Sequence, residues 1–304
     1  MLIYAGIDEA GYGPMLGPLC VGCAVFAVDD WQEGEAAPDL WERLAAGVCL
    51  QRKGAGRRVV IADSKKLKLH NSSKTKHPLV HLERGLAACL GELPATDAAL
   101  FEQLGVELAG APWHGGEAID LPVGNEPDLL RIAANNLRHV FEEAGVSLLD
   151  LRCLALSAAR LNESFDETHS KATTSFHLVM QHIAAIWDAH PEAHPRIVID
   201  RQGGRAHYGK ALGELLPGST IEVVAESPEV ARYHLRRDGR ELTLSFSTQA
   251  EDRHLPVALA SMAAKYVREL AMARFNRYFQ AQLPGLKPTA GYVQDARRWL
   301  REAA

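Results

Sequence analysis

Two apolar runs close to the N-terminus constrain the fold most, because a tight, turn-rich loop joins them. The first run, Leu2–Ile7, is typical of a short buried strand and ends at the adjacent acids Asp8 and Glu9. The loop that follows has three glycines and two prolines within eight residues. The second run, Leu19–Val28, predicts another strand, which we expect to return antiparallel to the first.

The rest of the chain alternates expected strands with expected helices, which favours an α/β domain with a mixed central sheet. The strand–helix–strand order over 196–225 has short links and suggests a parallel crossover, with Asp200 at the end of its first strand. Asp238-Gly239 predicts a β-hairpin over 233–246. Further strands are expected over 57–62 and 151–156, and helices over 79–90, 128–144, 173–189, 257–279 and 294–301.

Composition excludes several classes of protein. The chain is 47% hydrophobic and 23% charged, which is ordinary for a folded soluble domain and excludes collagen-like, disordered and coiled-coil chains. No apolar run approaches the roughly 20 residues of a membrane helix. Asp8 and Glu9 interrupt the first apolar stretch, so no signal peptide is expected. Five scattered cysteines argue against a disulfide scaffold, and we expect a cytoplasmic protein.

Charge is unevenly distributed along the chain. The formal net charge is −5, yet residues 50–78 carry nine Lys and Arg side chains and a single acid, Asp63. A basic arm on an acidic body suits the phosphate backbone of a nucleic acid. The alternative is a solvated, lysine-rich loop without a partner.

Acidic residues occur where expected strands and helices begin or end. Asp8 and Glu9 follow the first strand, Asp200 follows a later one, and Glu251 and Asp252 precede a long helix. Carboxylates that come together are costly unless a cation neutralises them, and hard oxygen ligands suit Mg²⁺ or Mn²⁺. The alternative is that these acids cap turns and a helix start. The thirteen histidines are scattered, and we expect solvent-facing or core positions for them.

Six segments in order along the chain resemble the signatures of one enzyme family, the type 2 ribonucleases H (ribonuclease HII). Any one of these segments alone would be a weak signal. They are GIDEAGYGPMLGPL (6–19), Asp63-Ser64-Lys65-Lys66-Leu67, Leu161-Asn162-Glu163, Val198-Ile199-Asp200, PVALASMAAK (256–265) and Gly291-Tyr292.

The resemblance implies a ribonuclease H-like fold, in which a mixed central sheet is flanked by helices. Its catalytic domain would span 1–280, with inserted segments at about 68–127 and 233–246, and a C-terminal helical extension would span 281–304. A monomer that binds no membrane is expected.

The resemblance also implies the chemistry of the site. The metal-binding and catalytic acids would be Asp8, Glu9, Asp200 and Asp252, which would hold Mg²⁺ or Mn²⁺ and hydrolyse an RNA–DNA hybrid or ribonucleotide-containing duplex DNA. RNA differs from DNA locally only in the 2′-hydroxyl, so a backbone loop that approaches the sugar closely is suited to recognise it. The substrate-binding residues would be Gly11, Tyr12, Gly13, Lys65, Lys66, Asn162, Ser261, Lys265 and Tyr292.

The chain departs from the family pattern at several positions. Tyr12 stands where the family has an arginine, and Glu251 is the alternative to Asp252 as the fourth acid. Two other functions stay open: a nuclease or resolvase of the same fold with a different nucleic-acid substrate, and a binding protein that has lost turnover. The segment Gly204–Lys210 fits part of a phosphate loop, but Ala211 lacks the hydroxyl that such a loop uses for Mg²⁺.

Overall fold

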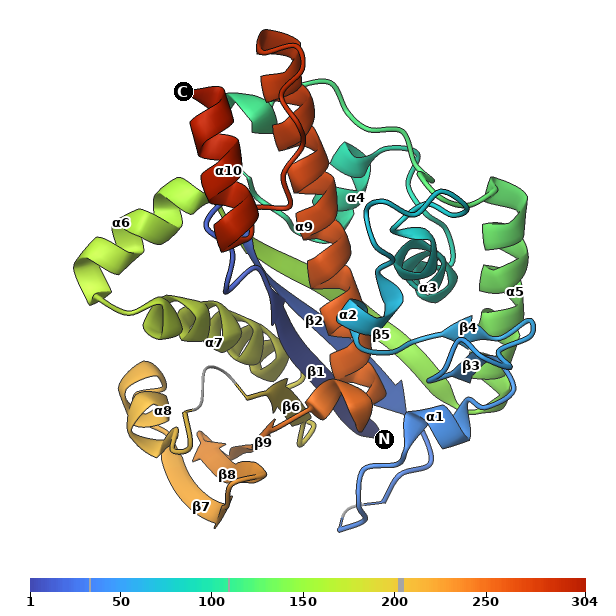
Figure 1. The fold of residues 1–304 in the computed structure, drawn as a ribbon. Helices are drawn as coiled ribbons and strands as arrows, with labels where there is room; N and C mark the ends of the chain where they lie inside the picture. Colours follow the sequence, from blue (N-terminus) through green and yellow to red (C-terminus); the bar gives the residue numbers. More distant parts are fainter. Residues whose placement is uncertain (33, 109, 202–204) are drawn as a thin grey trace.

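The computed structural model describes residues 1–32, 34–108, 110–201 and 205–304, and Figure 1 shows its ribbon. A mixed seven-stranded sheet forms the centre of the molecule, and helices cover it. Within the described ranges, the molecule has no helix that is both long and apolar enough to cross a membrane. The predicted fold class, an α/β domain with a mixed sheet flanked by helices, is confirmed.

The central sheet is built from strands of both halves of the chain. They are β1 (Leu2–Ala10), β2 (Leu19–Val28), β5 (Val146–Leu156), β6 (Arg196–Asp200), β7 (Thr220–Glu226), β8 (Val230–Arg237) and β9 (Arg240–Ser247). Their order in the sheet is β5-β2-β1-β6-β9-β8-β7. β1 pairs antiparallel with β2, as predicted, and parallel with β6, so the two strands that carry Asp8 and Asp200 are neighbours.

The helices account for most of the remaining chain, and the longer predicted ones form within a few residues of their expected bounds. They are α1 (Leu40–Arg43), α2 (Ser64–Leu67), α3 (Val80–Leu90), α4 (Asp97–Gln103), α5 (Pro127–Glu143), α6 (Ala158–Thr168), α7 (Lys171–Ala189), α8 (Gly209–Leu215), α9 (Leu255–Gln282) and α10 (Val293–Ala303), with 3₁₀ turns η1 (Pro112–His114) and η2 (Ala250–Asp252). A small parallel pair, β3 (Val48–Cys49) and β4 (Val59–Val60), lies apart from the main sheet.

Side-chain alternation along β1 and β2 divides the core between the two faces of the sheet. Tyr4 and Phe26 pack on one face with residues of α9, α3 and α5. Ile3 and Ile7 pack on the other face with residues of α7 and α8. Figure 1 shows α9 crossing the sheet, with α10 beside its C-terminal half. Because both faces are covered, polar side chains of these strands are accessible mainly at the strand ends.

α9 approaches the sheet unusually closely, and two glycines make this contact sterically feasible. A Cβ atom at Gly6 in β1 would lie 2.1 Å from the backbone nitrogen of Val257. A Cβ atom at Gly22 in β2 would lie 2.1 Å from the carbonyl oxygen of Ala260. No side chain fits into these spaces, so the glycines let the helix backbone rest directly on the sheet. This close approach brings Ser261 of α9 within hydrogen-bonding reach of Asp8.

The structure differs from the sequence predictions in three places. The hairpin expected as an insertion contributes strands to the central sheet, because β9 pairs parallel with β6. Its turn, Asp238-Gly239, has φ values of 53° and 75°, the left-handed conformation that a two-residue turn requires. β6 and β7 run in the same direction, but β9 and β8 lie between them, so they do not pair. Of the strand expected over 57–62, only Val59–Val60 forms.

Candidate active site

Asp8 and Asp200 lie side by side at the ends of two parallel strands. Ile7 of β1 is in register with Ile199 of β6, so the acids that follow them are adjacent. Burial and the charges of Asp200 and Glu9 raise the pKa of Asp8 well above its usual range, although a hydrogen bond to Ser261 opposes this. Burial also raises the pKa of Asp200. Burial and the closeness of the two side chains therefore make the charged forms of both carboxyl groups unfavourable.

Glu251 joins this pair from the 3₁₀ turn η2. The backbone N–H of Ala250 donates to Asp200 Oδ1 over 3.0 Å, which fixes the turn against the end of β6. The side chains of Glu251 and Asp200 are hydrogen-bonded, and burial together with the charge of Asp200 raises the pKa of Glu251 to about 7. Glu251 Oε2 is buried, and within the described part of the chain no group donates a hydrogen bond to it. A buried carboxylate oxygen without a donor is costly unless something else satisfies it.

Asp252, the next residue, lies in a different environment. Lys66 Nζ is 2.6 Å from Asp252 Oδ1 and 2.7 Å from Oδ2. The side chain of Asp252 is about one-third exposed, and that of Lys66 is more than half exposed. Of the two neighbouring acids weighed from the sequence, the structure therefore places Glu251 against Asp8 and Asp200 and places Asp252 in an ion pair at the rim.

Glu9 lies next to this group on β1, one residue beyond Asp8. Its charge contributes to the raised pKa of Asp8, so the two carboxylates are close enough to interact. The backbone N–H of Glu9 donates to Asp8 Oδ1 over 2.7 Å. The four acids Asp8, Glu9, Asp200 and Glu251 are called the acidic cluster below.

The short helix α2 brings a lysine to the acidic cluster. The Asp63 side chain accepts a hydrogen bond from the backbone N–H of Lys65 over 2.9 Å and so caps the helix. The hydroxyls of Ser64 and Ser261 lie 2.9 Å apart and dock α2 onto α9. Burial lowers the pKa of Lys65, but attraction to Asp63 and to acids of the cluster outweighs this and raises it. Lys65 is therefore held as a cation beside the carboxylates.

The loop between β1 and β2 is tied to the segment that carries Tyr292. The backbone N–H of Met15 donates to the carbonyl oxygen of Gly291 over 2.8 Å, and Arg268 Nη2 donates to that of Leu16 over 2.8 Å. Gly11 has a φ of 99°, which favours glycine. Tyr292 itself is 50% exposed. The predicted substrate residues Gly11, Tyr12, Gly13 and Tyr292 thus lie on two connected segments.

Lys265, another predicted substrate residue, is buried and already paired. Its Nζ lies 2.8 Å from Glu269 Oε1 and 3.5 Å from the Tyr292 hydroxyl. The geometry indicates that buried Lys265 helps to position Tyr292, whereas Lys65 and Lys66 are exposed at the surface. Asn162 is exposed on α6 and lines an apolar cavity of about 590 Å³ with Trp113. Among the described residues, no hydrogen bond joins the Asn162 side chain to the acidic cluster.

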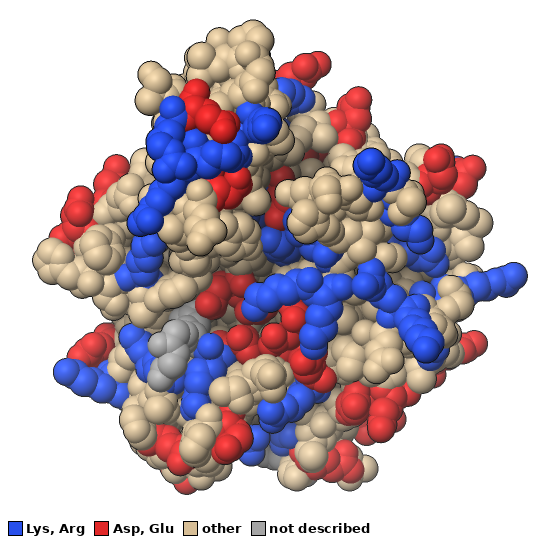
Figure 2. Space-filling view, in the orientation of Figure 1, with Lys and Arg blue, Asp and Glu red and all other residues tan. Residues whose placement is uncertain are grey.

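Figure 2 shows how charge is arranged around the site. Acidic side chains gather in a hollow near the middle of this face, and Lys and Arg side chains follow its border. This is the region where α2, α9 and the end of β1 meet in Figure 1. The basic segment 50–78 leads into the border through Lys65 and Lys66. An anionic polymer could therefore bind along the border while a cation occupies the hollow.

The donor set of the acidic cluster fits a hard divalent cation. All four side chains offer carboxylate oxygens, the ligands that Mg²⁺ and Mn²⁺ prefer. The buried Oε2 of Glu251 and the raised pKa values of Asp8 and Asp200 indicate negative charge that the described residues around it do not fully neutralise. Bound cations would remove this cost. Within the described residues, the only three ligand side chains whose atoms all lie within 4.8 Å of one another are elsewhere, at His194, His234 and Glu241.

One motif considered from the sequence lies partly outside the described residues. Gly204, the first glycine of Gly204–Lys210, is not described, while Gly209 and Lys210 begin α8. Lys210 Nζ lies 3.8 Å from Glu214 Oε1 on the same helix, and its side chain is almost fully exposed. This geometry assigns no ligand to the segment.

Comparisons with known proteins give structural similarities only. No family model and no curated protein sequence matches the chain. A structure of the PCNA:ribonuclease HII complex from Archaeoglobus fulgidus matches at 16% identity and a TM-score of 0.41, over 99% of this chain and 88% of that one. The ribonuclease H2 of Pyrococcus horikoshii OT3 matches at 18% identity and a TM-score of 0.43, and the match covers 99% of this chain and 86% of that one. Bst-RNase HIII in complex with Mn²⁺ matches at 17% identity and a TM-score of 0.48, and the match covers 99% of this chain and 62% of that one.

These solved structures belong to the group of enzymes that the sequence motifs resemble. Their low identities and TM-scores assign no activity to this chain, so its function has to be inferred from its own residues.

Proposed function

We propose that this protein is a divalent-metal-dependent endonuclease that hydrolyses RNA in RNA–DNA hybrids or ribonucleotides embedded in duplex DNA, and leaves 5′-phosphate and 3′-hydroxyl ends. The observation that carries the proposal is the convergence of Asp8, Asp200 and Glu251 at the adjacent ends of β1 and β6. One oxygen of Glu251 is buried and has no hydrogen-bond partner among the residues that the structure describes. The charged form of such a group of carboxylates is costly unless bound cations neutralise it.

The acidic cluster would hold Mg²⁺ or Mn²⁺ through Asp8 and Asp200, with Glu9 and Glu251 completing the set. Bound there, such cations would supply activation of water and stabilisation of the leaving oxygen in phosphodiester hydrolysis. The residues of the chain supply position and charge. Ser261 holds Asp8, the Ala250 N–H holds Asp200, and Lys65 stands beside both acids where a phosphate would approach.

Recognition of RNA would depend on the loop between β1 and β2. Only the 2′-hydroxyl distinguishes a ribonucleotide locally, and backbone groups of a glycine loop can approach it closely. Gly11, Tyr12 and Gly13 would take this role, and exposed Tyr292 would offer a surface on which a sugar can stack. Tyr12 replaces a guanidinium by a phenol, so we expect one phosphate contact fewer than an arginine would give.

Cleavage of defined duplexes tests the proposal directly. We expect the purified protein to cut a DNA duplex that holds a single ribonucleotide, or an RNA–DNA hybrid, when Mg²⁺ or Mn²⁺ is present. Asp8→Asn should abolish cleavage, because it removes charge from the centre of the cluster. Glu214→Gln, an exposed acid on α8, is the matched control and should cleave like the wild type. If the wild type leaves both duplexes intact with either metal, the proposal is wrong.

The same substrates distinguish the two other functions. Equal cleavage of branched molecules made of DNA alone would contradict reading of the ribose and would favour a nuclease with another substrate. Binding that survives EDTA without any cleavage would favour a binding protein that has lost turnover.

A further inference from the structure

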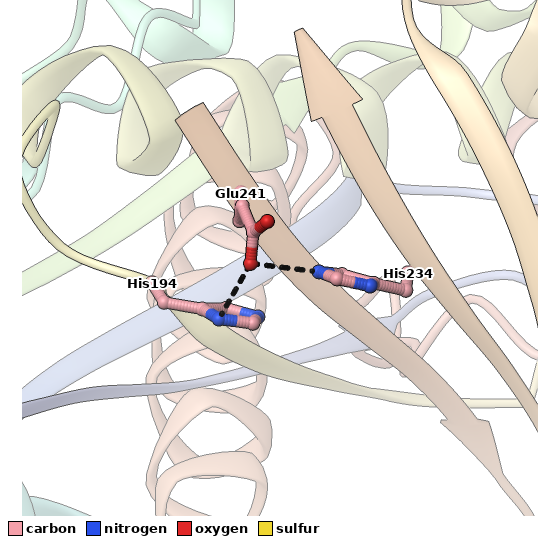
Figure 3. Close-up of side chains that lie close together, drawn as sticks. All are labelled: His194, His234 and Glu241. Atoms are coloured by element: carbon pink, nitrogen blue, oxygen red, sulfur yellow. Dashed lines mark hydrogen bonds and ion pairs between the residues drawn. The ribbon is translucent and has the colours of Figure 1, made fainter. Parts of the chain in front are cut away.

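A second group of metal-binding side chains lies at the far end of β6 from the acidic cluster. His194 precedes β6, His234 lies on β8 and Glu241 lies on β9 (Figure 3). Asp200 and Arg196 mark the two ends of β6, four residues apart, which corresponds to roughly 13 Å along a strand. The group is therefore separate from the acidic cluster, and the proposed nuclease chemistry does not use it.

The geometry of the three side chains suits a transition metal. Glu241 Oε2 lies 3.5 Å from His194 Nδ1 and 3.2 Å from His234 Nε2. A tetrahedral Zn²⁺ ion about 2.1 Å from each ligand separates neighbouring ligand atoms by about 3.4 Å. The two separations to Glu241 match this value, but the imidazole rings are stacked nearly parallel with their centroids 5.0 Å apart, so a ring has to turn before both nitrogens face one ion. Figure 3 shows that a nitrogen of each ring is near the same carboxylate oxygen of Glu241.

The outer atoms of His194 and Glu241 have hydrogen-bond partners that orient them. His194 Nε2 lies 2.8 Å from Thr243 Oγ1, and when Nε2 donates there, Nδ1 is the unprotonated ring nitrogen. His234 Nδ1 lies 3.9 Å from Glu222 Oε2. Glu241 Oε1 accepts from Arg236 Nε over 3.0 Å, which leaves Oε2 on the histidine side. Metal-binding histidines commonly use their other ring nitrogen in this way.

We propose that His194, His234 and Glu241 bind one Zn²⁺ ion, with water at the fourth position. Two imidazoles and one carboxylate form a ligand set that Zn²⁺ uses and that Mg²⁺ does not favour. Both histidines line a cavity of about 580 Å³, which leaves room for water on the open side. The ion joins the β8–β9 hairpin to the start of β6.

Calorimetric titration of the tag-free, EDTA-treated protein with Zn²⁺ tests this proposal. Excess Mg²⁺ is present throughout, so that sites made of oxygen ligands are already occupied. We expect one Zn²⁺ per chain and a higher thermal midpoint. Thr243→Val should weaken binding roughly 10- to 100-fold, because it removes only the partner of His194. Glu241→Gln and His234→Ala should weaken it further. His207→Gln is the matched control, since His207 is a solvent-exposed histidine beside Glu226, and should bind like the wild type.

Replacement of Zn²⁺ by Co²⁺ gives a second readout, a visible absorption typical of four-coordinate nitrogen and oxygen ligands. Failure to bind Zn²⁺ in excess Mg²⁺ would overturn the proposal. So would zinc affinity that is unchanged in Glu241→Gln and His234→Ala, because the ion would then lie elsewhere. Neither readout depends on nuclease activity, so failure of the proposed function would leave this test intact.

Discussion

At the scale of single residues, the site depends on which of two consecutive acids turns inward. Gln249 has a φ of 52°, and the 3₁₀ turn after it directs Glu251 toward Asp200. Asp252 instead pairs with Lys66 at the border. Charge alone does not separate the two residues, since both are acids that precede the same helix. Their positions relative to β6 distinguish them.

Exchange of each acid for its amide tests this distinction. We expect Glu251→Gln to lower the cleavage rate by about 100-fold or more, because it removes a charged ligand of the cluster. Asp252→Asn should lower it less than about 10-fold, since the Asp252 charge is already paired and partly solvated. Single-turnover cleavage of the ribonucleotide-containing duplex measures both. The reverse order of the two effects would show that Asp252 is the fourth acid.

His182 makes the stability of the protein depend on pH. It is buried on α7, lies 2.9 Å from the Val21 carbonyl oxygen, and burial lowers its pKa to about 4. The unfolded chain binds a proton at this histidine near pH 6.5, whereas the folded chain does not until about pH 4. The folded state therefore keeps its full stability above about pH 6.5 and loses part of it as the pH falls toward 4.

We expect the wild type to lose about 2 kcal/mol of unfolding free energy through His182 between pH 7 and pH 5. His182→Gln can keep the hydrogen bond to Val21 but cannot titrate, so its loss over this range should be smaller by that amount. Urea unfolding at both pH values measures it, with exposed His207→Gln as the control. An equal loss in His182→Gln and the wild type would refute this assignment.

At the scale of elements, the contact between α9 and the sheet positions the site. Gly6 and Gly22 let the helix backbone lie against β1 and β2, and this places Ser261 at Asp8 and, through Ser64, docks α2 with Lys65. The glycines are thus structural residues whose effect reaches the chemistry.

We expect Gly6→Ala and Gly22→Ala each to lower the unfolding free energy by at least about 1–3 kcal/mol, because the added methyl group overlaps the α9 backbone. Gly13→Ala is the matched control: a Cβ there meets no atom within 4 Å, so stability should change little. Urea denaturation midpoints provide the comparison. Wild-type stability in Gly6→Ala would mean that α9 does not lie this close to the sheet.

At the scale of the whole molecule, an acidic hollow is bordered by a basic arm. Arg52, Lys53 and Arg57 are among the basic side chains of segment 50–78, which leads to Lys65 at the acidic cluster. This arrangement allows the phosphate backbone to bind on the arm while cations screen the acids next to it.

The arm predicts salt-dependent binding. We expect a variant with Arg52→Gln, Lys53→Gln and Arg57→Gln to bind a hybrid duplex more weakly and to reduce the slope of log K against log salt by roughly 1 for each phosphate that the variant no longer neutralises. The control variant carries Arg131→Gln, Arg138→Gln and Lys210→Gln, whose charges lie beside acids on their own helices. Equal slopes in the arm variant and the wild type would mean that the arm does not bind the phosphate backbone.

Much of this architecture is predictable from the sequence, because apolar runs and turn residues are local signals. The bounds of β2 and the hairpin turn at Asp238-Gly239 are examples. The order of strands in a sheet depends on contacts between distant segments of the chain. Local patterns therefore predict the hairpin as an insertion and do not indicate that β9 pairs with β6. His194 and Glu241 meet only because of that pairing, and no spacing in the sequence indicates their contact.

The central claim is that the acidic cluster binds divalent cations, and an anomalous difference map of crystals soaked in Mn²⁺ tests it most directly. We predict a peak between Asp8 and Asp200, with Glu251 as a ligand and with Asp252 still on Lys66. A map at saturating Mn²⁺ with peaks elsewhere and none between Asp8 and Asp200 would contradict the account.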